Sequence, residues 1–149
     1  MEAKTKITKE MVENLSAGQL DELVYNKASD KYFGTFGENF ENTEKDKLLC
    51  QMFACSVLDF EVCNGGFDQF FSNNEDLAEF ALNGLLKINE IEHYEILLLA
   101  KKIYDEQKEI FKNIRNINLD ELDEKFYELK KIYNSRQKFI FENIEIFYD

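Results

Sequence analysis

The chain contains no proline in 149 residues, although average usage of about 5% would predict roughly seven. Proline interrupts helices, so only glycine and asparagine are left to end them here. Apolar residues recur at three- and four-residue steps along most of the sequence, and no segment shows the period of two that is typical of a strand. These patterns predict an all-α fold, and the length favours a single domain over residues 1–149.

The apolar spacing divides the chain into about seven helices, packed as a bundle. Helix starts are predicted where a capping residue precedes an apolar pattern, at residues 16–19, 43–46, 72–75, 89–92 and 118–121. Residues 29–42 are predicted to be a loop, held to the core by Tyr32, Phe33, Phe36 and Phe40. The predicted helical segments are 11–28, as one or two short helices, and 43–64, 67–71, 75–85, 89–114, 118–133 and 135–147.

The stretch EVCNGGFDQFFSN, residues 61–73, places two adjacent glycines between two helical patterns. Gly65 after Asn64 fits the end of a helix, because glycine accepts a positive φ without a Cβ clash. Gly66 then allows the next helix to start close to its neighbour. Three phenylalanines share one face of that helix and are expected to insert into the core as a wedge. The sequence therefore predicts a tight corner between two core helices.

Charge is distributed unevenly along the chain, whose 18 basic and 30 acidic residues give a net charge of −12. Residues 61–100 hold eight acidic residues and one basic residue, Lys87. Such a block repels nucleic acid and anionic membranes and attracts basic partners, although it can also serve only to keep a protein soluble. We expect the partner-binding residues among these acids to be Glu75, Asp76, Glu79, Glu90, Glu92 and Glu95, with Asp68 as a weaker candidate.

No pattern for catalysis, a metal or a cofactor is convincing. His93 is the only histidine, and a lone histidine does not make a Ser-His or Cys-His catalytic set. Cys50, Cys55 and Cys63 lack the CxxC pairs of zinc sites and are expected to be reduced, mostly buried thiols. The glycine pair lacks the Lys-Ser/Thr of a phosphate-binding loop. We therefore expect no cofactor and no metal.

Targeting and membrane signals are also missing from the sequence. No run of 18 apolar residues predicts a membrane span, and the first residues lack the apolar stretch of a secretory signal. A basic patch for direct nucleic-acid binding is absent, since the lysine pairs alternate with acids. These observations predict a cytoplasmic protein without membrane or nucleic-acid contacts, and they leave open whether it is a monomer or a dimer.

Residues 61–73 closely resemble the signature of the bacterial DNA-mimic-protein family, E-x-x-N-G-G-F-x-Q-F-F-x-N. Residues 119–127, LDELDEKFY, look like a later block of that family, and the resemblance spans about residues 20–149. It implies an all-α fold, no catalytic residues, and an acidic surface that imitates duplex DNA and occupies the DNA-binding face of a helix-turn-helix regulator. We expect the signature itself to be a structural motif formed by Glu61, Asn64, Gly65, Gly66, Phe67, Gln69, Phe70, Phe71 and Asn73.

Three functional hypotheses follow from the sequence. The first is a non-enzymatic acidic protein that binds the basic DNA-binding surface of a partner, such as a transcription regulator. The second is an immunity-type protein that neutralises a toxin such as a nuclease, since the same surface physics applies. The third is an enzyme with a pocket near residues 32–40 and the glycine corner, which requires a buried, convergent set of polar groups there.

Overall fold

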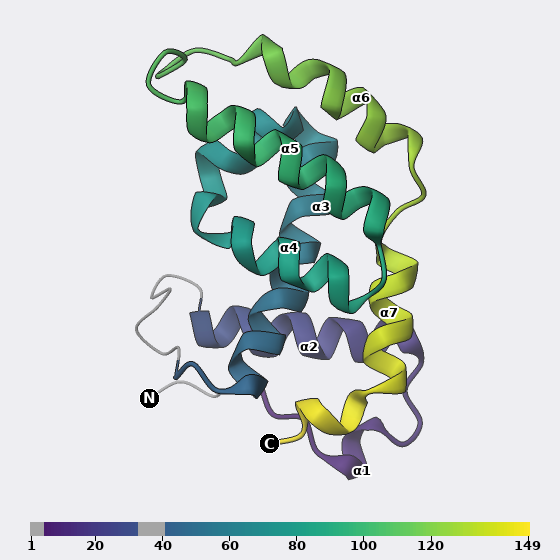
Figure 1. Cartoon of the computed structure of the whole chain (residues 1–149). Helices are drawn as coiled ribbons and strands as arrows, with labels where there is room; N and C mark the ends of the chain where they lie inside the picture. The colour runs from purple at the N-terminus through teal and green to yellow at the C-terminus, as the bar shows by residue number, and fades with distance from the viewer. Residues whose placement is uncertain (1–4, 33–40) are drawn as a thin grey trace.

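The computed structural model describes residues 5–32 and 41–149, and within these ranges the fold is entirely helical (Figure 1). Seven α-helices are present there, of which α1 is a single turn, so the predicted all-α bundle of about seven helices is confirmed. The helices are α1 Lys9–Val12, α2 Ala17–Tyr32, α3 Glu44–Asn74, α4 Ala78–Lys87, α5 Ile91–Gln107, α6 Asp120–Glu128 and α7 Tyr133–Glu142. Short 3-10 segments cover Glu75–Leu77, Ile117–Leu119 and Ile144–Phe147.

Helix α3 is the centre of the bundle, and α2, α4, α5, α6 and α7 all contact it. It runs along the length of the molecule, with α4 and α5 on the near side in Figure 1, α6 at one end and α2 at the other. Its start follows the predicted cap, because the Thr43 hydroxyl accepts the Asp46 N–H at 3.1 Å. Most of its circumference is buried, as expected for a helix that is apolar on most sides. Phe60 is the exception, since it was expected on the inner stripe and is exposed.

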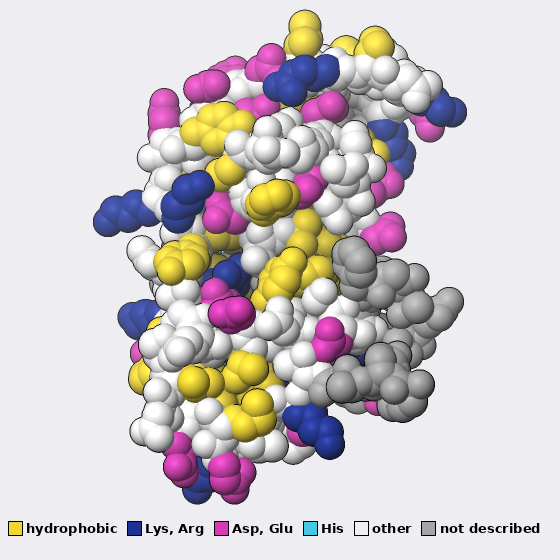
Figure 2. All heavy atoms as spheres, turned by 180° about the vertical axis from the view of Figure 1, so that it is seen from behind, with side chains coloured by type: hydrophobic (Ala, Val, Ile, Leu, Met, Phe, Trp, Pro, Cys, Tyr) yellow, Lys and Arg dark blue, Asp and Glu magenta, His cyan; other side chains and the backbone are white. Residues whose placement is uncertain are grey.

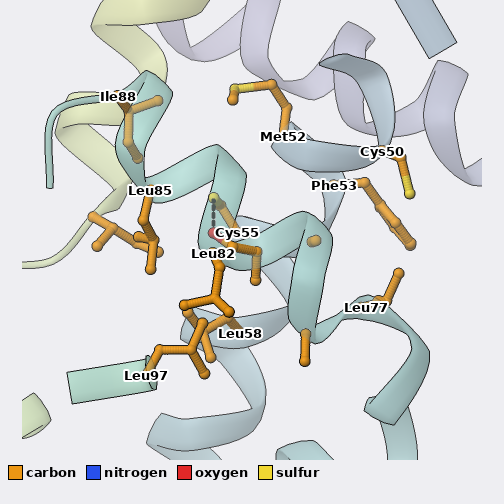
Figure 3. Close-up of a cluster of buried hydrophobic side chains, with 14 of the residues drawn as sticks. Cys50, Met52, Phe53, Cys55, Leu58, Leu77, Leu82, Leu85, Ile88 and Leu97 are labelled. Carbon is orange, nitrogen blue, oxygen red and sulfur yellow. Dashed lines mark hydrogen bonds between the residues drawn. The ribbon is translucent and has the colours of Figure 1, made fainter. Parts of the chain in front are cut away.

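Helix α4 lies very close to α3 because Gly84 has no side chain at the crossing. A Cβ atom on Gly84 would lie 2.6 Å from the Cys55 Sγ and 2.7 Å from the Gln51 carbonyl oxygen. The Cys55 thiol in turn donates to the Ala81 carbonyl at 3.8 Å (Figure 3). Around this crossing, α3, α4 and α5 contribute one buried apolar cluster, which includes Leu58, Leu82, Leu85 and Leu97 (Figure 3).

Helices α2 and α7 are joined by a buried ion pair. The Arg136 guanidinium donates to both carboxylate oxygens of Asp21, with Nε 3.0 Å and Nη2 2.6 Å from them. Both side chains are buried, and this two-point geometry is the strong form of the arginine–carboxylate bond. Helix α2 starts with the predicted capping box: the Ser16 amide donates to Gln19 Oε1 at 2.9 Å, and the Gln19 amide donates to Ser16 Oγ at 3.2 Å.

Several predicted boundaries are wrong. Helix α2 continues to Tyr32, so residues 29–32 of the predicted loop are helical, while residues 33–40 lie outside the described residues together with their aromatic side chains. Helix α5 ends at Gln107 rather than near residue 114, and Ile114 is exposed. The left-handed φ of 69° at Asn113 shows that the chain turns there although the apolar spacing continues.

The predicted helix over residues 118–133 is also divided in two. Helix α6 ends at Glu128, and Tyr133 begins α7 with its ring exposed. The capping signatures at residues 72–75 and 89–92 do not form side-chain caps, because neither Asn74 nor Glu90 bonds to a helix amide. Helix α3 instead passes through the 3-10 turn Glu75–Leu77 directly into α4. Over residues 5–32 and 41–149, no helix combines the length and hydropathy of a membrane span.

Candidate functional site

The double glycine forms a sharp kink inside α3. Gly65 has φ −153° and Gly66 has φ 80°, so the positive φ lies at Gly66 and not at Gly65 as the sequence suggested. The close approach expected at Gly66 is present: a Cβ atom there would lie 2.3 Å from a carboxylate oxygen of Asp123. That carboxylate accepts the Phe67 N–H at 2.8 Å. An acid of α6 therefore occupies the space that the missing side chain leaves and caps the second half of α3.

The sequence pattern of Asp120, Glu121, Asp123 and Glu124 predicts the solvated face of an amphipathic helix, but Asp123 is only 3% exposed. Burial raises the pKa of its carboxyl, although the Phe67 N–H and the Arg115 guanidinium act in the opposite direction. Arg115 Nη2 lies 3.4 Å from Asp123 and 2.7 Å from Asp120, and Arg115 Nη1 donates to the Gly65 carbonyl at 3.4 Å. These polar groups satisfy one another and form a structural network that links α6 to the kink of α3.

The signature residues connect the two halves of α3 across the kink. Asn73 Nδ2 donates to Glu61 Oε2 at 2.8 Å, and Asn64 Nδ2 donates to Gln69 Oε1 at 3.4 Å. The three phenylalanines of the wedge are buried, as the sequence predicted. They contact aromatic rings of other helices: Phe67 meets Phe126 edge to face, and Phe71 stacks on Tyr104. Phe70 packs against Phe71.

The structure places the seven predicted partner-binding acids in two different environments. Asp68 and Glu90 are partly buried and hold internal contacts: Asp68 accepts the Asn116 N–H at 3.3 Å, and Glu90 bonds to His93 Nδ1 at 2.8 Å and to the Ser135 hydroxyl. The other five are exposed, namely Glu75, Asp76, Glu79, Glu92 and Glu95.

Two of the exposed acids pair with lysines of the α5 region. Lys108 lies 3.2 Å from Glu75, and Lys101 lies 3.8 Å from Glu79. Glu75 also acts on Tyr104, because burial and a hydrogen bond to Glu75 raise the pKa of that phenol to about 12. Exposed pairs of this kind contribute only about 0–1 kcal/mol, so a stronger cationic partner can replace the lysines. Among the described residues, Asp76, Glu92 and Glu95 make no ion pair.

Sequence reasoning missed a second group of acids that lies beside the first. Helix α6 contacts α5 and runs back along it in the opposite direction (Figure 1). The exposed acids of these two helices are Glu92, Glu95, Asp105 and Glu106 on α5 and Glu121, Glu124 and Glu128 on α6. The three- and four-residue spacing of the α6 acids could have identified them, but the sequence was interpreted as an ordinary solvated face.

The two helices thus present two neighbouring carboxylate rows. At about 1.5 Å of rise per residue, the α5 acids extend over about 21 Å as two pairs about 15 Å apart, and the α6 acids over about 10 Å. Three lysines lie among these seven acids: Lys101 is bonded to Asp105 at 2.7 Å, Lys125 lies 3.6 Å from Glu121, and Lys102 has no ion pair within the described residues. We call these α5 and α6 acids the acidic rows. The opposite face of the molecule carries acids among hydrophobic and basic side chains, most densely toward the α6 end (Figure 2).

Large apolar side chains lie on the surface beside the acidic rows. Leu98 and Leu99, on α5, are each 47% exposed. Leu86 near the end of α4 and Ile91 at the start of α5 are also exposed. A surface with apolar side chains surrounded by charged ones is typical of a protein-binding site rather than of a purely solubilising surface.

The described residues contain no group of three or more His, Cys, Asp or Glu side chains placed to hold a metal ion. Two of the three cysteines are buried, and Cys63 is exposed. The expected pocket at residues 32–40 falls largely outside the described residues.

A model of the family described as DMP19-like protein matches residues 47–143 of the chain. The match includes the signature at residues 61–73 and the later block at residues 119–127, and it lies within the span of about 20–149 expected from the sequence. No curated protein and no solved structure shows a significant match to the chain.

Proposed function

Since the chain belongs to the DMP19-like protein family, the DNA-mimic family that its signature resembles, we propose that it is a non-enzymatic interaction protein of the cytoplasm. Its acidic surface binds the basic DNA-binding surface of another protein, such as a helix-turn-helix transcription regulator. The acidic rows and the exposed acids Glu75, Asp76 and Glu79 form this surface.

The observation that carries the proposal is the arrangement of carboxylates on two adjacent antiparallel helices. Duplex DNA presents negative charge along two antiparallel strands, with one charge per about 1.7 Å of axis. The acidic rows are sparser than DNA and include three lysines, but each also runs along a rigid axis. Like charges at helical spacings destabilise a helix by a few tenths of a kcal/mol per pair, and a function in binding accounts for that cost.

The electrostatic part of such binding acts before contact and depends strongly on salt. The net charge of −12 steers a basic partner toward this protein and raises the association rate. The Debye length is about 10 Å at 0.1 M ionic strength, so added salt screens this attraction. The exposed Leu98 and Leu99 supply an apolar contact that salt does not weaken, so we expect affinity to fall with salt and then level off.

Partner capture is the first experiment. The protein is immobilised, exposed to lysate of the source cell at low salt and eluted with a salt gradient, and bound proteins are identified by mass spectrometry. A DNA-binding protein that elutes with salt and is displaced by duplex DNA supports the proposal. A co-encoded toxin that duplex DNA fails to displace indicates an immunity protein instead, and a partner with salt-insensitive affinity contradicts the electrostatic mechanism.

Charge-matched variants then locate the surface on the captured partner. One variant replaces three acids of the acidic rows with glutamine, Glu92, Glu95 and Glu124. Its control replaces three exposed acids near α1 and α2, Glu10, Glu13 and Glu22. Both variants change the net charge by the same amount, so long-range steering changes equally. We expect the first to weaken binding about 10–100-fold and the control to weaken it less than about threefold, and equal effects would refute the assigned surface.

A further inference from the structure

A cavity of about 370 Å³ opens beside the kink of α3, and residues of α5 and α6 form part of its lining. Its lining includes Cys63 of α3, His93 of α5, Tyr127 of α6, and Lys130 and Lys131 from the segment before α7. A second groove of about 450 Å³ adjoins it and shares Asp59, Cys63 and Lys131. The combined space is in the range of small-molecule sites, about 300–1,000 Å³, and Cys63 lies where the two spaces meet.

Cys63 differs from the other two cysteines in exposure and in its neighbours. Its Sγ lies 2.9 Å from the Lys131 Nζ and 3.8 Å from Asp59 Oδ1. The Lys131 ammonium donates to the sulfur, and the Cys63 thiol donates to the Asp59 carboxylate. Burial raises the pKa of both Cys50 and Cys55 to about 12. Cys63 is therefore the thiol that is accessible for chemistry.

His93 provides an independent sign that the cavity takes a ligand. The side chain is 97% hidden from solvent and lines the cavity. Its Nδ1 is held 2.8 Å from Glu90, which also accepts the Ser135 hydroxyl. Because Glu90 accepts the Nδ1–H, the other ring nitrogen of the neutral imidazole carries a free lone pair. No group of the described residues bonds to that nitrogen, and it keeps some solvent access although the side chain is otherwise hidden, so it is available to a molecule in the cavity.

We propose that Cys63 is a modification site that forms a mixed disulfide with a small anionic disulfide bound in this cavity. The Cys63 thiolate attacks one sulfur of the reagent, a new S–S bond forms, and the old S–S bond breaks. The Cys63 sulfur is oxidised, the other half of the reagent leaves as a reduced thiolate, and the Cys63 proton goes to water. No further oxidant is needed, because the disulfide itself is the oxidant.

The preference for an anionic reagent comes from the local charges. Lys130 and Lys131 both line the cavity, in a chain whose net charge of −12 repels anions overall. Asp59 opposes the lysines, which leaves one net positive charge beside Cys63. An anionic disulfide should therefore react faster than the charge of the whole protein predicts. This inference does not depend on the proposed partner of the acidic rows.

The test compares two aromatic disulfides on the full chain, anionic dithiobis(nitrobenzoic acid) and neutral dithiodipyridine, each of which releases a coloured thiol. Both rates are divided by those of a free cysteine peptide, so that intrinsic reagent reactivity cancels. The adduct is located by intact-mass and peptide mass spectrometry, with Cys63→Ser as the identity control. Lys131→Met removes the ammonium beside the sulfur. Lys87→Met, on the exposed end of α4, makes the same change of net charge at a residue that does not line the cavity.

We expect one thiol per folded chain to react, at Cys63, and all three after denaturation. The normalised anionic-to-neutral ratio should exceed one for the native protein, fall about tenfold in Lys131→Met, and stay within about twofold in Lys87→Met. Oxidised glutathione, an anionic biological disulfide, should give the same single adduct. A normalised ratio below one, equal ratios for the two lysine variants, or adducts on Cys50 or Cys55 in the folded protein would overturn the proposal.

Discussion

Replacing Gly66 with alanine tests whether the kink of α3 requires glycine. Gly66 has φ 80° and ψ 179°, a backbone region that only glycine occupies without strain, and holding another residue there costs about 1–3 kcal/mol. The new Cβ would also lie 2.3 Å from an Asp123 oxygen. The carboxylate must move away, which leaves the buried Phe67 N–H without its acceptor at a cost of about 1–3 kcal/mol.

The expected loss of unfolding free energy for Gly66→Ala is therefore about 2–6 kcal/mol, a large part of the 5–15 kcal/mol typical of a folded domain. Urea unfolding followed by far-UV circular dichroism measures it from the midpoint and slope. Gly18→Ala is the control, because a Cβ there makes only ordinary contacts, with Gln137 Nε2 at 3.6 Å and Ser16 Oγ at 3.9 Å. Since alanine is the better helix former, we expect this control to be neutral or to stabilise by up to about 1 kcal/mol.

A double-mutant cycle separates the two costs at Gly66. In an Asp123→Ala background the carboxylate clash is absent, so Gly66→Ala should cost only the backbone strain of about 1–3 kcal/mol. A loss below about 1 kcal/mol for Gly66→Ala in the native background would refute the strain argument. An equal loss in both backgrounds would refute the role given to the Asp123 contact.

Three further predictions concern other parts of the bundle. Arg136→Met leaves the buried Asp21 carboxylate unpaired and should lower the free energy of unfolding by about 3–5 kcal/mol, measured by urea unfolding; a loss below about 1 kcal/mol would show that the pair is not buried in solution. Asp149 is partly buried, which acts to raise its pKa, but its bonds to Lys27 and to the Ile7 amide outweigh this and lower the pKa below 3.8. The stabilisation that these Asp149 bonds provide should therefore be present above pH 3.8 and be lost as the pH falls through the lowered pKa. An Asp149→Asn variant should melt at a lower temperature than the native protein at pH 7, and at the same temperature once the Asp149 carboxylate is protonated. Gly84→Ala should destabilise by about 1–3 kcal/mol in thermal melts because its Cβ would meet the α3 backbone, and an unchanged melting temperature would contradict the close helix crossing.

The sequence predicted the features that depend on neighbouring residues. The helical periods, the caps at Ser16 and Thr43, and the buried face shared by the wedge phenylalanines are all set within a few residues, and the structure shows each of them. Features that depend on distant segments were missed. Asp123 looked like a solvated acid because its helix alone does not reveal that its carboxylate fills the space at Gly66.

The candidate surface shows the same limit. Acids close together in the sequence, in residues 75–95, were identified as one group, but Glu90 is used internally by His93 and Ser135. The acids of α6 were not assigned to the group, because only the packing of α6 against α5 brings them beside it. Charge density along a sequence therefore indicated the kind of partner, while the three-dimensional packing determined which carboxylates lie together.

The capping of Phe67 by Asp123 also has a consequence for the order of folding. The two residues are separated by 56 positions, so the cap forms only after a long loop has closed and α6 has docked, which costs chain entropy that the formation of a local helix does not. The two halves of α3 can form early as independent helices, whereas the angle between them is fixed late. We therefore expect variants of Asp123 to accelerate unfolding while leaving the folding rate nearly unchanged.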